Sequence, residues 1–284
     1  MDVINNKADV LARPVERIPG VKRSRIGARG RERLNDVWLG GLLPLLVAVV
    51  WQIAGDWGFV SQRFLPTPIA IAEAGFELLR SGELMHHLGI SLGRAALGFL
   101  LGGGLGLAFG LVVGLSQRAE NVLDPSVQML RMIPHLALAP LIILWFGFGE
   151  LSKVLIIAKG AFFPLYIHTF LGIRSVDNKL FEVARVLEFS RTRRLWRLVM
   201  PAALPNILLG LRLSLSLSWL GLVVAELIGS QAGVGFLINF AKQNSNTEVI
   251  FVGILIFAVV GKLVDSLVRL LERRWLQWRE SYQG

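Results

Sequence analysis

The chain has 284 residues, of which 54% are hydrophobic and 18% charged, and its mean hydropathy is +0.58. This composition excludes a disordered chain and a collagen-like repeat, and it is too apolar for most soluble enzymes. Thirty Lys and Arg residues against twenty Asp and Glu residues give a net charge of +10. In a soluble protein that excess indicates nucleic-acid binding, so its placement along the chain has to be compared with the hydropathy.

Several site chemistries are excluded by residue type. The chain has no cysteine, which excludes disulfides, thiolate metal sites and thiol nucleophiles. Its four histidines do not stand at a paired metal-ligand spacing. Gly261-Lys262 is followed by Leu263, so the phosphate-binding P-loop pattern is absent. The chain is therefore not expected to hold a metal or to bind ATP through a P-loop of its own.

Six apolar segments are each long enough to cross a bilayer, which takes about 17–25 residues of helix. The third and fourth carry charged residues and would also fit buried core helices, but six such segments leave too little polar sequence to cover them. We therefore predict an all-α, polytopic membrane protein with six transmembrane helices over residues 37–270. The segments are Val37–Gly55, Gly93–Leu115, Val127–Gly147, Lys153–Ile173, Leu204–Ile228 and Val249–Leu270.

The basic residues gather on one side of these segments. Nine precede the first segment, one lies between the second and third, seven lie between the fourth and fifth, and three follow the sixth, whereas the opposite loops hold three. Because cytoplasmic loops collect Lys and Arg, both termini are expected in the cytoplasm. The charge is then a signal of membrane topology, and nucleic acid is not an expected partner.

The two ends of the chain lie outside the apolar segments. Residues 1–36 are basic, contain two prolines and show no apolar periodicity, so a disordered cytoplasmic segment resting on anionic lipid is expected. This segment is too long for the start of a signal peptide, and no small-residue cleavage site follows the first apolar segment. We expect an uncleaved first helix, and a cytoplasmic tail over residues 271–284.

The second apolar segment carries a glycine at every fourth position. On a helix this spacing makes one smooth face, against which another backbone can pack closely. The spacing leaves open whether the partner helix belongs to the same chain or to a second copy. The five residues are Gly98, Gly102, Gly106, Gly110 and Gly114.

Prolines also fall within the apolar segments. Carbonyl groups freed by a proline can line a substrate path, although a proline can equally bend a helix without touching substrate. The third segment combines two prolines with Arg131, His135 and Trp145, which makes it the strongest candidate for a substrate path. The prolines are Pro44, Pro134, Pro140 and Pro164.

Ionisable side chains within the apolar segments are candidates for function, because burying them in a membrane is costly. Lys262 and Asp265 are three positions apart and are expected to pair. Glu226 either pairs with a neighbouring cation or lies on the path. Arg212 lies about 12 Å into its helix and, like Arg131, is a candidate for the path. Lys159 fits a snorkelling or paired lysine.

The sequence over residues 89–93 matches the GxSxG pattern of serine hydrolases, with His86 and His87 close to Ser91. A nucleophile elbow needs a strand, a turn and a helix, whereas this stretch leads into the glycine-rich apolar segment. Small residues at the start of a helix are the preferred interpretation, and an intramembrane serine hydrolase is the remote alternative.

The loop over residues 174–203 is patterned as two short amphipathic helices. Asp177 and Ser190 are suited to cap them, and Pro201 is expected to stop the second. The apolar face of the first is Leu180, Phe181, Ala184 and Leu187. Two such helices suit docking onto a cytoplasmic partner, although a pair lying on lipid would have the same pattern.

Within this loop, Glu182-Val183-Ala184 followed by Leu198-Val199-Met200-Pro201 resembles the EAA loop of binding-protein-dependent ABC importer permeases. Glu182, Ala184 and Pro201 match the family pattern, and Leu198 is a conservative replacement. Glu188 stands where the family has glycine, and this affects the turn between the two helices, because a glycine enters turns that other residues enter with difficulty.

Further motifs resemble the aliphatic-sulfonate branch of these permeases, to which taurine and nitrate permeases are closely related. The similarity covers nearly all of the chain after residue 37. The motifs include Phe64–Pro68, Gln128–Arg131, Pro134–Leu141, Leu144–Gly147, Gly210–Arg212 and Val224–Glu226.

The resemblance implies a type I ABC importer permease with the MetI-like fold, working as a homodimer in a bacterial inner membrane. Two cytoplasmic ABC ATPase subunits would hold ATP and Mg, an external binding protein would deliver the substrate, and the permease would bind no cofactor itself. The coupling residues would be Glu182, Ala184, Glu188, Leu198 and Pro201. The implied substrates are aliphatic sulfonates, with taurine, nitrate or another small anion as alternatives. A gated channel stays a further alternative and would conduct without ATP.

Overall fold

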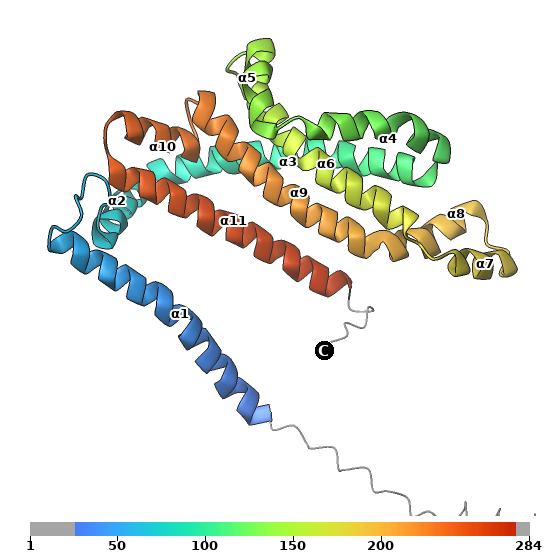
Figure 1. Ribbon diagram of the computed structural model, residues 1–284, viewed down its shortest axis with the longest axis horizontal. Coiled ribbons are helices and arrows are strands. Elements are labelled where there is room, and N and C mark those ends of the chain that lie inside the picture. The colour runs from blue at the N-terminus through green and yellow to red at the C-terminus, as the bar shows by residue number, and fades with distance from the viewer. Residues whose placement is uncertain (1–25, 277–284) are drawn as a thin grey trace, which may run out of the picture. The chain divides into compact units, whose positions relative to one another are not determined.

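The computed structural model describes residues 26–276, and every regular element among them is a helix (Figure 1). The predicted all-α class is confirmed. The helices are α1 (Ile26–Asp56), α2 (Pro68–Arg80), α3 (Glu83–Leu115), α4 (Gln117–Met132), α5 (His135–Phe146), α6 (Glu150–Arg174), α7 (Asn178–Val186), α8 (Arg191–Arg194), a π-helical turn (Leu195–Val199), α9 (Met200–Gly229), α10 (Val234–Gln243) and α11 (Thr247–Trp275).

The α1 helix differs from the expectation at its start. It begins at Ile26, so residues 26–36, which were expected to be disordered, are helical. Ala, Arg, Glu and Leu are strong helix formers, and a helix once nucleated in the apolar stretch extends readily through them. Residues 1–25 and 277–284, with most of both expected tails, lie outside the described residues.

Four helical stretches in the described part of the chain are long and apolar enough to cross a membrane. They are Glu83–Leu115, Glu150–Arg174, Arg191–Gly229 and Thr247–Trp275. The shorter apolar stretch Gly41–Asp56 and the pair formed by α4 and α5 fall where the remaining two segments were predicted. The arrangement is consistent with six crossings.

The third predicted segment, Val127–Gly147, is broken into two helices rather than formed by one continuous helix. The chain bends by 103° between α4 and α5. Pro134 lies at the bend, and the preceding Ile133 is extended, with φ −69° and ψ 120°. The helical region is disfavoured for a residue before proline, and here the helix ends at that residue. Pro44, Pro140 and Pro164, in contrast, lie inside continuous helices.

The centre of the 54–276 part is a layer in which α6 packs against both α3 and α9. The glycine face of α3 packs on α6 of the same chain, which answers the question that the spacing left open. A Cβ atom built on Gly102 would lie 1.9 Å from the carbonyl oxygen of Ala158, and one on Gly106 would lie 2.4 Å from that of Phe162. All five glycines are buried, so the two backbones touch along the length of the stripe.

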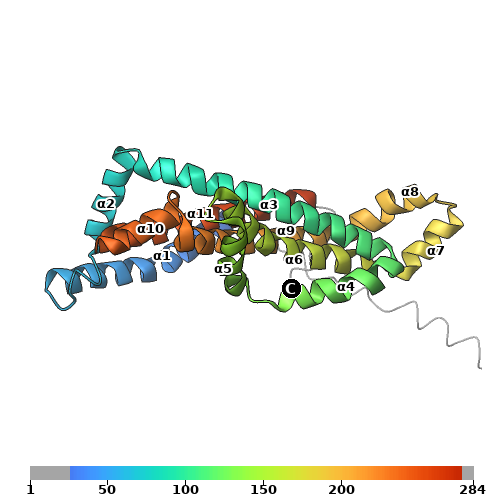
Figure 2. The ribbon, with the colours of Figure 1, turned by 90° about the horizontal axis from the view of Figure 1, so that it is seen from above.

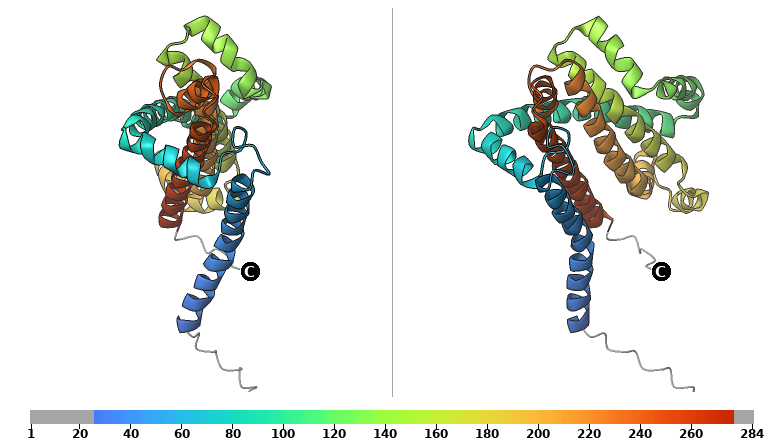
Figure 3. Two further views of the ribbon diagram at one scale, coloured as in Figure 1. Left: turned by 90° about the vertical axis from the view of Figure 1, so that its left-hand side faces the viewer. Right: turned by 60° about the vertical axis from the view of Figure 1, so that its left-hand side comes forward.

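The remaining helices surround this layer. α4 and α5 lie on the side of α6 away from α11, and α11 runs along α9 (Figures 1 and 3). α2 and α10 lie at one end of the layer, and α7 and α8 lie at the other (Figure 2). We refer to these as the α2–α10 end and the α7–α8 end.

Candidate functional site

The α7 helix exposes an apolar surface at the α7–α8 end. Asp177 caps it as predicted, its carboxylate accepting a hydrogen bond from the Lys179 backbone N–H at 2.9 Å. Ala184 is fully buried, and Phe181 packs against the core cluster of Val199 and Ala203. The outer side carries the exposed carboxylate of Glu182 and four exposed apolar side chains, Leu180, Val183, Val186 and Leu187.

The turn after α7 has the shape that a glycine would favour. Glu188 has φ +52°, in the left-handed region that costs an L-residue about 1–2 kcal/mol. Its backbone N–H donates to the Arg185 carbonyl at 3.1 Å, and the Phe189 N–H donates to the Ala184 carbonyl at 2.9 Å. These two bonds form a Schellman motif. Glu188 therefore adopts a backbone conformation that favours glycine, the residue of the EAA pattern at this position.

The second helix of this segment does not end at Pro201, contrary to the prediction. Ser190 caps α8 by accepting from the Arg193 N–H, and the helix then continues through the π-helical turn into α9. The Met200 N–H donates to the Leu195 carbonyl, five residues back. Pro201 lies in the first turn of α9, where a missing N–H and a fixed φ are tolerated because the wider π turn precedes it.

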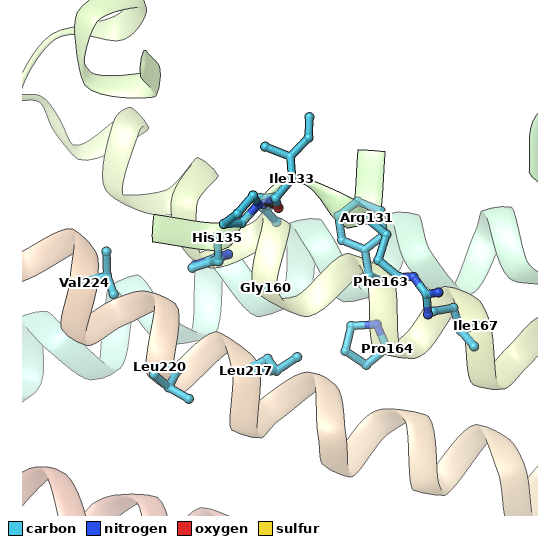
Figure 4. Close-up of a pocket in the computed structure, with 12 residues that line it drawn as sticks. Arg131, Ile133, His135, Gly160, Phe163, Pro164, Ile167, Leu217, Leu220 and Val224 are labelled. Carbon is cyan, nitrogen blue, oxygen red and sulfur yellow. Dashed lines mark hydrogen bonds between the residues drawn. The ribbon is translucent and has the colours of Figure 1, made fainter. Parts of the chain in front are cut away.

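A cavity of about 470 Å³ lies between α5, α6 and α9, next to the break at Pro134 (Figure 4). Three basic residues line it, namely Arg131, His135 and Lys159, and none of the residues that line it is acidic. Most of the remaining wall is apolar, including Ile133, Phe163, Ile167, Leu217, Leu220 and Val224.

The polar groups of this cavity keep much of their hydrogen-bonding capacity. The Lys159 ammonium donates one bond, to the Ile133 carbonyl at 2.8 Å. Arg131 forms no hydrogen bond or ion pair with any residue that the structure describes. The His135 Nε2 atom is buried and finds no partner within the described chain. Two predicted path residues, Arg131 and His135, are thus brought together here with Lys159.

A second polar cluster lies nearer the α2–α10 end and was missed in the sequence. Arg94 is only 5% exposed. Its Nε and Nη2 donate to the two carboxylate oxygens of Glu150 at 2.6 Å, and its Nη1 donates to Glu226 Oε1 at 2.8 Å. Lys153 donates to Glu150 at 2.9 Å. An arginine directly after the first residue of an apolar segment was the signal that could have predicted this cluster.

Glu226 is fully buried and is held from three sides. Besides Arg94, it accepts from the Ser91 hydroxyl at 2.8 Å and from the Gly235 N–H at 2.8 Å, in the first turn of α10. Gly233 has φ +109°, and a Cβ atom there would lie 2.2 Å from Glu226 Oε1. The expectation that Glu226 pairs with a cation is confirmed, and the cluster ties α3 and α6 to α9 and α10.

Ser91 takes part in this cluster as a structural hydroxyl. Its Oγ donates to Glu226 and accepts from the Val234 N–H at 2.9 Å. The nearby His87 Nδ1 accepts from the Gly233 N–H at 3.1 Å. Its carboxylate partner is held by Arg94 and Ser91 has no exposed surface, so Ser91 lacks the access that a serine nucleophile requires.

Arg212 lies elsewhere, between α9 and α11. Its Nε donates to Asp265 Oδ1 at 2.7 Å, and Arg269 donates to Asp265 Oδ2 at 2.9 Å. The expected pairing of Lys262 with Asp265 was therefore wrong, because two guanidinium groups already hold that carboxylate. Trp145 is 65% exposed on α5 and does not line the 470 Å³ cavity. For Trp145, Arg212 and Glu226, a place on the substrate path stays a prediction.

The chain was compared with known protein families. Residues 102–277 match the model of the binding-protein-dependent transport system inner membrane component. The chain belongs to this family. The predicted resemblance is confirmed, and the chain is a multi-pass membrane subunit of an ABC transporter rather than an enzyme. Membership implies an ATPase and a binding protein as partners.

Relatives that are described as transport permeases align over most of this chain. It is 61% identical to the putative aliphatic sulfonates transport permease protein of Bacillus subtilis, over 90% of this chain and 92% of that protein. It is 46% identical to the Escherichia coli protein of the same description, over 84% and 91%. Identity to the taurine transport system permease of Escherichia coli is 36%, over 86% and 90%.

Solved structures confirm the fold. An amino acid ABC transporter matches with a TM-score of 0.60 and 21% identity, covering 70% of the permease and 96% of that chain. The MetNI methionine ABC transporter matches with a TM-score of 0.57 and 16% identity, covering 69% and 97%. The predicted MetI-like fold of type I importers is therefore correct.

Proposed function

We propose that the permease carries aliphatic sulfonate ions into the cell. The observation that carries this proposal is the 61% identity, over 90% of the chain, to a protein described as an aliphatic sulfonate permease, against 36% to a taurine permease. The cavity supports it, since an opening lined by basic and apolar side chains suits an anion with a hydrocarbon tail. The alternative substrate is taurine, nitrate or another small anion. A permease for one of these ions would transport it in preference to an alkanesulfonate.

The permease works as a homodimer with two ATPase subunits, which bind ATP and Mg, and with an external binding protein. The α7–α8 end faces the cytoplasm, because seven basic residues lie in the chain between residues 174 and 203. Both termini lie on the same side, in a bacterial inner membrane. Lipid surrounds the outward apolar faces, and basic residues outside the spans contact anionic head groups.

The α7 helix docks on the ATPase. Val183, Val186 and Leu187 supply exposed apolar contact area, and Glu182 supplies a charge at the same helix. The Schellman turn at Glu188 and the continuous run from Leu198 through Pro201 into α9 give the docked helix a stiff connection to the membrane spans. Closure of the ATPases on ATP would move α7 and reorient the spans, and hydrolysis would reset them.

Reconstitution tests this function. The permease, its ATPase and its binding protein are placed in liposomes, and uptake of a labelled alkanesulfonate is measured with and without ATP. We expect uptake that needs both ATP and the binding protein. Conduction without ATP would indicate a gated channel, and stronger uptake of taurine or nitrate would favour the alternative substrates. Labelling of Ser91 by a serine-hydrolase probe would support the remote enzymatic alternative.

A charge reversal tests the docking helix. Glu182→Lys is expected to lower both sulfonate uptake and the amount of ATPase retained during purification. Glu272→Lys is the matched control, because it makes the same charge change near the end of α11, outside the coupling segment. Normal uptake and retention in Glu182→Lys would contradict the docking role.

A further inference from the structure

We propose that Lys159 and Arg131 hold the sulfonate head group inside the membrane domain, in the 470 Å³ cavity, while the apolar wall of that cavity holds the alkyl chain. The inference rests on the proposed function and adds a binding site within the permease itself, separate from the binding protein. Lys159 was not among the residues that the sequence pointed to as path residues, and its role follows from its position at the cavity.

The charges of the cavity select an anion. An arginine and a lysine line it, and no Asp or Glu of the described chain does. Other cations near the layer are already paired with carboxylates: Arg94 with Glu150 and Glu226, Lys153 with Glu150, and Arg212 with Asp265. Lys159 is half-buried, and a positive charge partly shielded from water attracts an anion more strongly than one in open solvent. A sulfonate, which stays ionised at any physiological pH, supplies that charge.

The available donors match the head group. The Lys159 ammonium has three N–H groups and spends one on the Ile133 carbonyl. That carbonyl is the one before Pro134, at the break between α4 and α5, so the break orients the lysine toward the cavity. Arg131 adds a guanidinium with no partner among the described residues. Three sulfonate oxygens can accept from both side chains.

The shape of the cavity depends on His135 and two glycines. A Cβ atom on Gly221 would lie 2.9 Å from His135 Nε2, and one on Gly160 would lie 3.4 Å from His135 Cε1. The imidazole therefore fits between α6 and α9 because both positions lack a side chain, and it forms the wall of the cavity at the start of α5 (Figure 4).

The rest of the cavity suits a hydrocarbon chain. Leu217, Leu220 and Val224 on α9 form an apolar wall, and Phe163 on α6 adds an aromatic ring beside Arg131 (Figure 4). Each methylene buried against such a wall strengthens binding by about fourfold. We therefore infer a preference for alkanesulfonates with several carbons over methanesulfonate, and a weak response to inorganic anions.

The head-group contact is tested in the reconstituted complex with its binding protein and ATPase. Lys159→Met is expected to lower ATP-dependent uptake of butanesulfonate by roughly 10- to 100-fold, the loss typical of hydrogen bonds to a charged group. Lys159→Arg keeps the charge and should restore most of the uptake. Lys262→Met is the matched control, since it removes an exposed lysine from α11 away from the cavity. Basal ATPase activity should stay normal in Lys262→Met, and retention of the ATPase during purification reports whether each variant still assembles.

The apolar wall is tested by filling it. Leu220→Trp is expected to slow the uptake of octanesulfonate far more than that of ethanesulfonate, because the added ring takes the space of the longer chain. Leu255→Trp, at an exposed position of α11, should affect both substrates equally. An equal effect of Leu220→Trp on both chain lengths would contradict the tail-binding wall.

Outcomes for the site and for the proposed function can be told apart. If the wild-type complex carries no sulfonate, the proposed function fails. If it carries sulfonate and uptake by Lys159→Met equals that by Lys262→Met, the binding site alone is wrong.

An anionic lipid head group is the other possible source of the negative charge that Lys159 and Arg131 would bind. Uptake is therefore measured in liposomes of pure phosphatidylcholine and in liposomes with added phosphatidylglycerol. A loss in Lys159→Met that appears only with phosphatidylglycerol would identify a lipid site and overturn the proposal.

Discussion

The guanidinium of Arg94 on α3 donates to the carboxylate of Glu226 on α9 at 2.8 Å, across 132 positions of sequence. Both side chains are buried, and the same guanidinium binds Glu150 on α6 through two further bonds. One arginine therefore joins all three helices of the central layer near the α2–α10 end. Burying such a pair is compatible with stability only while every member keeps its partners.

We expect Arg94→Met to destabilise the permease by about 3–5 kcal/mol, the cost of leaving a buried charge unpaired. Glu226→Gln should also destabilise it, because a neutral amide leaves Arg94 less well compensated. Thermal unfolding in detergent and the yield of the purified complex measure both effects. Arg80→Met, at the exposed end of α2, is the control, and an Arg94→Met midpoint equal to that of the control would contradict the role of the cluster.

Gly102→Ala is expected to weaken the contact between α3 and α6. The new methyl group would lie 1.9 Å from the Ala158 carbonyl oxygen, so the two backbones must separate, at a cost of about 1–3 kcal/mol. Gly104 lies two residues away on the same helix and has no atom within 4 Å of a Cβ position. Gly104→Ala should therefore be neutral or stabilising. Equal unfolding temperatures for the two variants would show that the stripe does not set the helix separation.

Glu188→Gly is expected to stabilise the turn after α7 by roughly 1 kcal/mol, because glycine adopts φ +52° without the steric cost of a side chain. Glu188→Val should destabilise the same turn. The unfolding temperature of the permease reports the first effect, and retention of the ATPase reports whether the docking surface is kept. A more stable Val variant than Gly variant would be inconsistent with the backbone explanation.

A double-mutant cycle on Arg212 and Asp265 decides between two roles for Arg212. If the pair mainly holds α9 to α11, Arg212→Gln and Asp265→Asn should lower stability and uptake to a similar extent. Their combination should then cost less than the sum of the two, with a coupling of about 0.5 kcal/mol or more. Since Arg212 already bonds Asp265, we expect this result. A much larger loss of uptake in Arg212→Gln would instead support its place on the path.

Hydropathy and local signals predicted much of the architecture. The apolar segments at 93–115, 153–173, 204–228 and 249–270 are found within α3, α6, α8–α9 and α11, because twenty consecutive apolar residues leave few alternatives to a membrane helix. The caps at Asp177 and Ser190 were likewise predicted, since a cap depends on residues two or three positions away. The start of α1 at Ile26 and the continuation of the helix through Pro201 were not predicted. A helix, once formed, extends into flanking residues whose own sequence gives no helical signal.

Some residues of the candidate sites were predicted from the sequence and others were not. Arg131 and His135 share one short segment, and their common cavity could be anticipated from that spacing. Lys159 joins them from α6, and its meeting with the Ile133 carbonyl across 26 positions follows from the bend at Pro134. Arg94 escaped notice because a single arginine at the edge of an apolar segment looks the same whether it meets solvent or two carboxylates.

The net charge of +10 also separates what the sequence determines from what the tertiary structure decides. By itself the sequence determined that the chain is a multi-span helical membrane protein, and from its charge distribution it predicted which side faces the cytoplasm, because hydropathy and the distribution of Lys and Arg are properties of the chain order. Only the tertiary structure decided which cations are neutralised, as Arg94 and Arg212 are, and which remain available, as Lys159 and Arg131 are. Whether a charge is paired depends on helices far apart in sequence, and their contacts exist only once α3, α6, α9 and α11 have packed.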